Sequence, residues 1–241
     1  MRPVLSIRHF SHWHEAVLAV LLLALLGWAR IVDPSFLAPA TQAELSTHVW
    51  ELALLALPMT LIILTGGIDL SVGATMALAA VVLGLGYEAG WPIPIAIIVA
   101  VLTGLFGGLV NGMAVTGIGV HPLIVTLATM AAYRGVAEGI SMARPISGFP
   151  EAFAVLGQGT VAGIPVPGLI FAVAFCLVGA FLWLMPWGRC LYAIGHNERA
   201  CRFSGIPSRL IKLWLYALSG ATAGLTAVLN VSRRNTAKAD I

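Results

Sequence analysis

The sequence predicts an all-α, polytopic transmembrane helical bundle of about seven spans, with broken or re-entrant helices among them. Of its 241 residues, 59% are hydrophobic and only 10% are charged, whereas charged residues make up about 25% of a typical soluble domain. The mean hydropathy is +0.96. Since one span takes about 20 residues, the length accommodates about seven helices with short connections, and we expect one transmembrane domain over residues 1–241.

The first two apolar runs cover residues 16–28 and 49–64. The first run has the character of a signal peptide, but so many apolar segments follow that we interpret it as an uncleaved helix. We expect it to end at Asp33-Pro34, because proline disfavours a helical conformation in the residue before it. Pro58 predicts a kink in the second run.

A polar joint, Thr65-Gly66-Gly67-Ile68-Asp69-Leu70-Ser71, separates the second run from the third. It is too short for a domain-sized loop and too polar to face lipid, so its free backbone groups need protein or a watery cavity around them. A carboxylate at the centre of a bilayer helix costs at least about 2.5 to 3.5 kcal/mol, which makes Asp69 a functional candidate. Asp69 or Ser71 could cap the next helix, lie at the edge of a solute path, or contact a solute directly.

The third and fourth runs, residues 70–86 and 93–115, carry Gly and Ala at spacings that suit close helix packing. Asn111 is the strongly polar side chain of the fourth run, suited either to an interhelical hydrogen bond or to solute contact. A fifth segment opens at His121-Pro122, where proline is tolerated in a first helical turn. Residues 139–167 are rich in Gly and Pro and predict irregular or re-entrant structure.

The sixth and seventh spans, residues 168–185 and 210–231, enclose the most charged part of the chain. The positive-inside rule therefore places residues 187–209 in the cytoplasm. If the N-terminus is inside and each apolar run crosses the membrane once, the basic residues after 231 lie outside, which the rule disfavours. Residues 197–204 predict a short helix ended by glycine and proline, suited either to docking a partner or to contact with anionic lipid.

The sequence predicts no catalytic, metal or cofactor site. Cys176, Cys190 and Cys201 are odd in number and lack C-x-x-C spacing, so we assign them neither a metal nor a disulfide. No G-x-x-x-x-G-K-[ST] phosphate loop occurs, so ATP is expected to bind elsewhere. The basic residues lie in loops and at chain ends rather than on one face, so nucleic-acid binding is not expected.

Four motifs resemble, in order, the permeases of bacterial sugar ABC importers of the ribose, xylose and rhamnose type. They are Thr65 to Gly73, Asn111-Gly112, Pro122 to Met130 with Arg134-Gly135, and Tyr192 to Gly195 continuing to Gly205-Ile206. The resemblance implies a permease subunit in the bacterial inner membrane that forms, with a second permease in a homodimer or heterodimer, the path for a monosaccharide such as a pentose or rhamnose. It also implies a separate cytoplasmic ABC ATPase, a periplasmic sugar-binding protein and surrounding membrane lipid.

The resemblance assigns two groups of candidate residues. Candidates for the translocation path are Thr65, Gly66, Gly67, Asp69, Ser71, Asn111 and Thr126. Candidates for ATPase docking, on a coupling helix within the cytoplasmic loop 187–209, are Asn197, Glu198, Arg199, Ala200, Arg202, Phe203 and Gly205.

Two features depart from the family pattern. Arg199 and Cys201 stand where such permeases often carry a Glu-Ala-Ala-like sequence, and relatives continue past the position of Ile241 into further helices. We therefore expect a permease that is C-terminally incomplete relative to the family. The alternatives are an ion-gradient-driven secondary transporter with Asp69 as the coupling carboxylate, or a truncated, inactive permease remnant.

Overall fold

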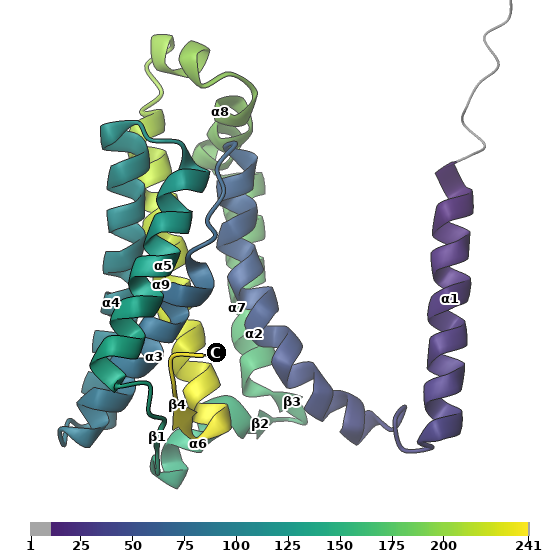
Figure 1. The fold of residues 1–241 in the computed structure, drawn as a ribbon. Helices are drawn as coiled ribbons and strands as arrows, with labels where there is room; N and C mark the ends of the chain where they lie inside the picture. The colour runs from purple at the N-terminus through teal and green to yellow at the C-terminus, as the bar shows by residue number, and fades with distance from the viewer. Residues whose placement is uncertain (1–10, 241) are drawn as a thin grey trace, which may run out of the picture. The chain divides into compact units, whose positions relative to one another are not determined.

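The computed structural model describes residues 11–240, and the chain divides into two compact units that meet between Ser46 and Thr47. Helices dominate the fold (Figure 1). The elements are α1 (Ser11–Val32), α2 (Pro39–Leu64), α3 (Val72–Glu88), α4 (Ile93–Met113), the π-helical turn η2 (Ala114–Ile118), α5 (Pro122–Ser141), β1 (Ile146–Ser147), α6 (Glu151–Gln158), β2 (Thr160–Val161), β3 (Ile164–Pro165), α7 (Val166–Leu184), α8 (Pro186–Phe203), α9 (Ser208–Arg234) and β4 (Thr236–Ala237).

The first unit contains α1 and the start of α2. Helix α1 ends at Val32, which confirms the predicted stop at Asp33-Pro34. The Asp33 carboxylate then closes the turn, because Oδ1 accepts hydrogen bonds from the backbone N–H and the hydroxyl of Ser35 at 2.8 and 2.7 Å.

Seven apolar helical stretches in the described residues match the predicted number of spans. Five are long and apolar enough to cross a membrane by length and composition: Glu15–Val32, Ile93–Ile118, Pro122–Ser141, Val166–Leu184 and Ser208–Arg234. Two shorter ones, Val49–Leu64 and Val72–Glu88, precede and follow the polar joint. The fold class predicted from the sequence is therefore confirmed.

Helix α9 is the buried centre of the second unit, because 78% of its most apolar stretch lies inside the protein. It crosses α4 where glycines on both helices face one another. A Cβ on Gly108 would collide with the carbonyl oxygen of Tyr216, and a Cβ on Gly104 with that of Gly220. The small residues expected to allow close packing thus bring the two backbones into contact.

An irregular segment covers the end of α9, as the Gly- and Pro-rich composition predicts. Strand β1 pairs antiparallel with β4, with Ile146 opposite Ala237. The N–H of Phe149 donates to Asn235 Oδ1 at 2.9 Å, and the N–H of Gly157 donates to Ser232 Oγ at 2.8 Å. These contacts join the segment to the C-terminal end of α9 and to the residue that follows it.

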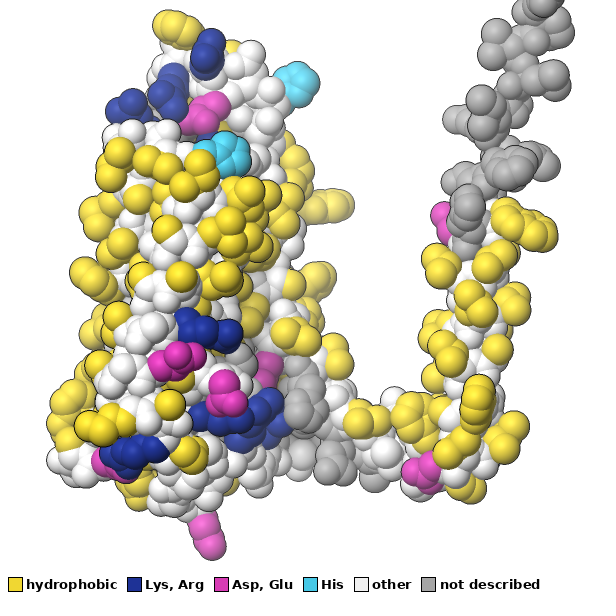
Figure 2. Space-filling view, viewed as in Figure 1, with side chains coloured by type: hydrophobic (Ala, Val, Ile, Leu, Met, Phe, Trp, Pro, Cys, Tyr) yellow, Lys and Arg dark blue, Asp and Glu magenta, His cyan; other side chains and the backbone are white. Residues whose placement is uncertain are grey.

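Basic side chains lie at both ends of the second unit. Helix α8 lies at one end and α6, β1 and β4 lie at the other (Figure 1), and dark-blue Lys and Arg side chains are visible toward both (Figure 2). At the α6 end, Arg233 pairs with Glu51 at 2.7 Å and Lys238 with Asp240 at 3.2 Å. Two of the three basic residues that the positive-inside rule disfavours there, Arg233 and Lys238, therefore have an acidic partner.

Candidate functional site

The helix break predicted from the polar joint is present in the structure. Helix α2 ends at Leu64 and α3 begins at Val72, and we call residues 65–71 between them the broken-helix loop. Gly66 adopts φ +75°, a left-handed conformation that favours glycine. The N–H of Gly67 returns to the carbonyl of Ile62 at 3.0 Å. A Cβ on Gly67 would approach Ile62 Cγ2 to 2.8 Å, so the loop is closely covered by protein.

The Asp69 carboxylate is the centre of a buried polar network. Its Oδ1 accepts hydrogen bonds from the N–H of Ser71 at 3.0 Å and from Ser71 Oγ at 2.7 Å, and its Oδ2 accepts one from Ser219 Oγ at 2.9 Å. The Asn111 side-chain amide donates to Ser71 Oγ at 2.7 Å. All four residues are at most 2% exposed. The network thus joins the broken-helix loop to α4 and α9.

The path candidates separate into three groups. Asp69, Ser71 and Asn111 come together. The hydroxyl of Thr65 instead donates to the carbonyl of Ile62 in the last turn of α2, and that of Thr126 donates to the carbonyl of Pro122 in its own helix, α5. Ser71 holds the N-cap position of α3, yet its side chain makes no capping hydrogen bond. Gly66 is the exposed member of the seven, and Gly67 is buried. The described conformation therefore closes the network away from solvent.

Sequence reasoning missed two contributors from α9. Ser219 supplies the hydrogen bond to Asp69 Oδ2, and the Tyr216 hydroxyl donates to the carbonyl oxygen of Ile68 at 3.2 Å. Both lie on one helical face because they are three residues apart. That spacing was the available signal, but a Ser and a Tyr in an apolar helix equally fit lipid-facing or packing positions.

The predicted short helix in the charged segment is also present. Helix α8 changes direction at Asn197, whose φ of −156° and ψ of 93° are not helical. The Asn197 side chain accepts a hydrogen bond from the N–H of Ala200 at 3.0 Å, which is an N-cap contact. We call residues 198–203 the short helix. It ends in a glycine turn, with Gly205 at φ +82° and the N–H of Ile206 bonded to the carbonyl of Cys201 at 2.9 Å.

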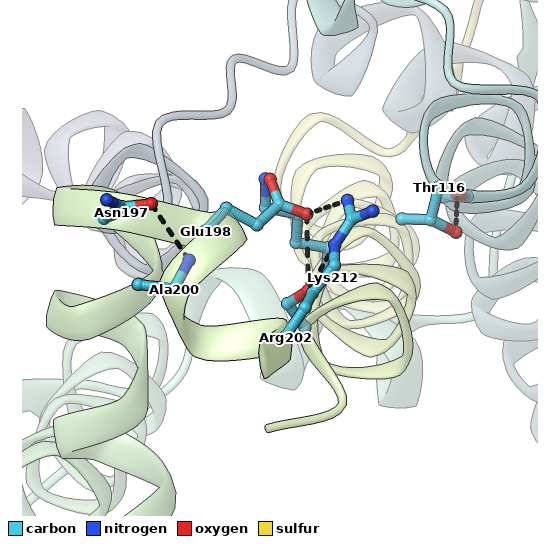
Figure 3. A network of polar contacts seen from close by, with 8 residues as sticks. Thr116, Asn197, Glu198, Ala200, Arg202 and Lys212 are labelled. Carbon is cyan, nitrogen blue, oxygen red and sulfur yellow. Dashed lines mark hydrogen bonds and ion pairs between the residues drawn. The ribbon is translucent and has the colours of Figure 1, made fainter. Parts of the chain in front are cut away.

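The carboxylate of Glu198 forms ion pairs with two basic side chains of the same chain (Figure 3). Its Oε1 accepts from Arg202 Nη2 and its Oε2 from Lys212 Nζ, each at 2.5 Å. Burial alone would raise the pKa of Glu198, but the hydrogen bonds and charges of Arg202 and Lys212 outweigh burial and lower it to about 2. Glu198 is therefore ionised at neutral pH and joins the short helix to α9.

Other docking candidates face outward. The Phe203 side chain is 94% exposed, and Arg199, Ala200 and Gly205 are exposed as well. Within the described chain, Arg199 takes part in no ion pair. An exposed aromatic ring beside an uncompensated positive charge is a surface suited to contact with a partner.

An apolar groove of about 400 Å³ lies between α2, α7 and α9. Its lining is aliphatic and aromatic, with Leu54, Val178 and Trp214 among its members, and the hydroxyl of Thr222 donates within its own helix. A polar solute would lose hydrogen bonds with water there without replacing them. The broken-helix loop remains the better candidate for a polar solute.

Comparison with known proteins identifies the family. Residues 43–241 match the family described as "Branched-chain amino acid transport system / permease component". The chain belongs to this permease family. The permease is thus a transport subunit rather than an enzyme, and it is a multi-pass protein of the inner membrane. This family match, together with the relatives described next, confirms the predicted resemblance to sugar ABC importer permeases.

Several relatives are named autoinducer 2 import system permease protein LsrD. The protein from Klebsiella pneumoniae subsp. pneumoniae is 33% identical over 95% of this chain and 71% of its own length. The Yersinia enterocolitica protein is 36% identical over 95% of this chain and 71% of its own. The Salmonella typhimurium protein is 34% identical over 97% and 72%. No solved structure matches the permease at a significant level.

Proposed function

We propose that the permease conducts a small, uncharged, polyhydroxylated solute of monosaccharide size through an ATP-driven importer of the inner membrane. The observation that carries this proposal is the similarity to LsrD proteins, 33% to 36% identical over at least 95% of this chain. The name of these relatives makes autoinducer 2 the first solute to test. Pentoses and rhamnose, which the sequence motifs favour, are the next candidates.

The broken-helix loop is the proposed wall of the path. Asp69, Ser71 and Asn111 bring hydrogen-bonding groups together beside the break between α2 and α3, and Gly66 in the same loop is exposed. Buried polar groups of this kind can exchange internal partners for the hydroxyls of a sugar. We propose alternating access, in which the closed network opens toward the path. Thr65, Gly67 and Thr126 would then support the loop and α5 by their internal contacts.

The short helix is the proposed docking element for a separate ABC ATPase. Phe203 and Arg199 are its outward-facing groups, whereas Asn197, Glu198 and Arg202 are bonded within the chain. Ala200 and Gly205 shape the helix and its end. A second permease subunit and a periplasmic sugar-binding protein complete the proposed importer, as its family implies.

Ion-gradient-driven transport through Asp69 has less support. Both carboxylate oxygens accept hydrogen bonds from the protein, three in all. A carboxylate that stabilises a helix break in this way is satisfied without a bound ion. We therefore favour ATP as the energy source and Asp69 as a group that holds the loop.

Uptake in cells tests the solute. The permease is expressed with its ATPase and binding protein in a strain without related importers, and accumulation of labelled autoinducer 2, ribose, xylose and rhamnose is measured for each solute separately. We expect accumulation of at least one of them. Absence of uptake for all four would refute the proposed solute class.

Copurification of the ATPase tests docking separately. Phe203→Ala and Arg199→Gln should each reduce recovery of the ATPase with the tagged permease. Trp183→Ala is the matched control, because this ring on α7 is 86% exposed and lies outside the short helix. Equal recovery with Phe203→Ala and Trp183→Ala would refute the docking assignment.

A further inference from the structure

The short helix is fastened to α9 by a contact that the docking proposal does not use. Lys212 lies in the second turn of α9 and its side chain is only 16% exposed, while that of Glu198 is 27% exposed. The Ser208 hydroxyl at the start of α9 donates to Glu198 Oε1 at 3.3 Å. A movement of the short helix therefore pulls on an ion pair that is mostly shielded from solvent.

Helix α9 also contacts the broken-helix loop, about two turns beyond Lys212. From Lys212 the next polar contacts of α9 with other elements are Tyr216, bonded to the carbonyl of Ile68, and Ser219, bonded to Asp69. Steps of four and three residues keep these side chains on one face of the helix. Seven residues correspond to a rise of about 10 Å. The three contacts thus form one row along about two turns.

Helix α8 also reaches the other end of the loop directly. A Cβ on Gly195 would collide with the carbonyl oxygen of Leu64, the last residue of α2, so the two backbones are in close contact. Gly195 lies two residues before the kink at Asn197. The loop is therefore contacted at its start from α8 and at Asp69 from α9.

Helix α9 is suited to transmit displacement rather than absorb it. Most of it is buried, and its backbone lies against α4 at Gly104 and Gly108. Close-packed interiors have few voids into which a helix can bend. A shift at Lys212 is therefore carried along the helix to Ser219.

We infer that Lys212, Tyr216 and Ser219 are positioning residues that couple the short helix to the broken-helix loop through α9. In this arrangement Glu198 and Lys212 act as an internal latch and not as contacts of the ATPase. The inference rests on the proposed function, in which the short helix receives the ATPase and the loop borders the path. The inference adds the residues through which a movement of the short helix reaches the broken-helix loop.

Amide hydrogen exchange of the full chain in lipid nanodiscs tests the coupling without the ATPase. The variants are Glu198→Gln, Lys212→Gln and the double variant. We expect exchange of residues 66–71 to rise about fivefold in each, the effect of losing one ion pair worth about 1 kcal/mol. The double variant should raise exchange of the loop no further than the single ones, because each of them breaks the same Glu198–Lys212 pair; Glu198→Gln also loses the pair with Arg202, which lies within the short helix.

Three controls separate coupling from local loosening. Ser219→Ala should raise exchange of the loop directly. Thr222→Val should leave it unchanged, because the Thr222 hydroxyl donates only to carbonyls of Leu218 and Ser219. Arg199→Gln removes a charge from the short helix without touching the latch, so it should weaken ATPase recovery and leave loop exchange unchanged.

The possible outcomes distinguish this inference from the proposed docking. If Glu198→Gln and Lys212→Gln raise exchange only within residues 198–212, the coupling is refuted and docking stands. If both variants lose the ATPase to the same extent as Arg199→Gln, Glu198 and Lys212 are docking contacts and the latch is refuted. Raised loop exchange with full ATPase recovery and fewer solute molecules imported per ATP supports the inference.

Discussion

Substitution of Asp69 gives the sharpest test of the buried network. Asp69→Ala removes the acceptor of three hydrogen bonds, two from Ser71 and one from Ser219. At about 0.6 kcal/mol each, the average for hydrogen bonds between membrane helices, the loss is about 2 kcal/mol. The hydroxyls of Ser71 and Ser219 can rotate toward other acceptors, but the buried N–H of Ser71 cannot, and one donor left without a partner adds about 1 kcal/mol or more. We therefore expect Asp69→Ala to lower the free energy of unfolding by about 3 kcal/mol.

Asp69→Asn separates geometry from charge. The amide oxygen can still accept from the N–H and hydroxyl of Ser71, and the amide N–H₂ can donate to Ser219, whose hydroxyl also accepts. We expect this variant to lose only about 1 kcal/mol, because it retains the same shape and all three contacts.

Reversible unfolding of the purified permease in mixed detergent measures both variants against Thr222→Val. If Asp69→Ala is as stable as the wild type, the network contributes nothing to the stability of the fold. Equal losses in Asp69→Ala and Asp69→Asn would show that the negative charge, rather than the hydrogen-bond pattern, holds the loop. Either result would contradict the account given for Asp69.

Three further predictions concern other parts of the permease. Gly108→Ala should cost about 1 to 3 kcal/mol by forcing α4 away from α9, whereas Gly73→Ala, with open space around its Cβ position, should cost less than 1; thermal unfolding compares them. Glu51→Ala should cost about 3 kcal/mol, since it leaves the mostly buried Arg233 guanidinium without this carboxylate, and the same assay measures it. The pKa of Glu198 is lowered from 4.5 to about 2, so its stabilisation is fully present above about pH 4.5 and is lost as the pH falls toward 2; unfolding followed from pH 8 to pH 3 should show an acid-induced loss that Glu198→Gln reduces.

The sequence was sufficient to predict the helix break because local chemistry determines it. Two glycines, a carboxylate and a serine between apolar runs fit no continuous span, and the loop from Thr65 to Ser71 follows from that alone. The short helix was predictable for the same reason, since Asn197 caps its start and Gly205 ends it.

The partners of these elements were not predictable because they come from distant positions. Ser219 lies 150 residues from Asp69 and Lys212 lies 14 from Glu198, and helical periodicity identifies a face without naming its neighbour. Thr126 matched a family motif, yet its hydroxyl bonds within α5. Glu198 was predicted as a candidate for ATPase docking, and the sequence did not show that Arg202 and Lys212 would both pair with its carboxylate.

Energised uptake in proteoliposomes tests the central claim most directly. The permease is reconstituted with its ATPase and binding protein, and uptake of the labelled solute is measured with ATP, without ATP, and with ionophores that abolish proton and sodium gradients. We predict uptake that requires ATP and persists when both gradients are abolished. Uptake that continues without ATP and disappears with the ion gradient would contradict it.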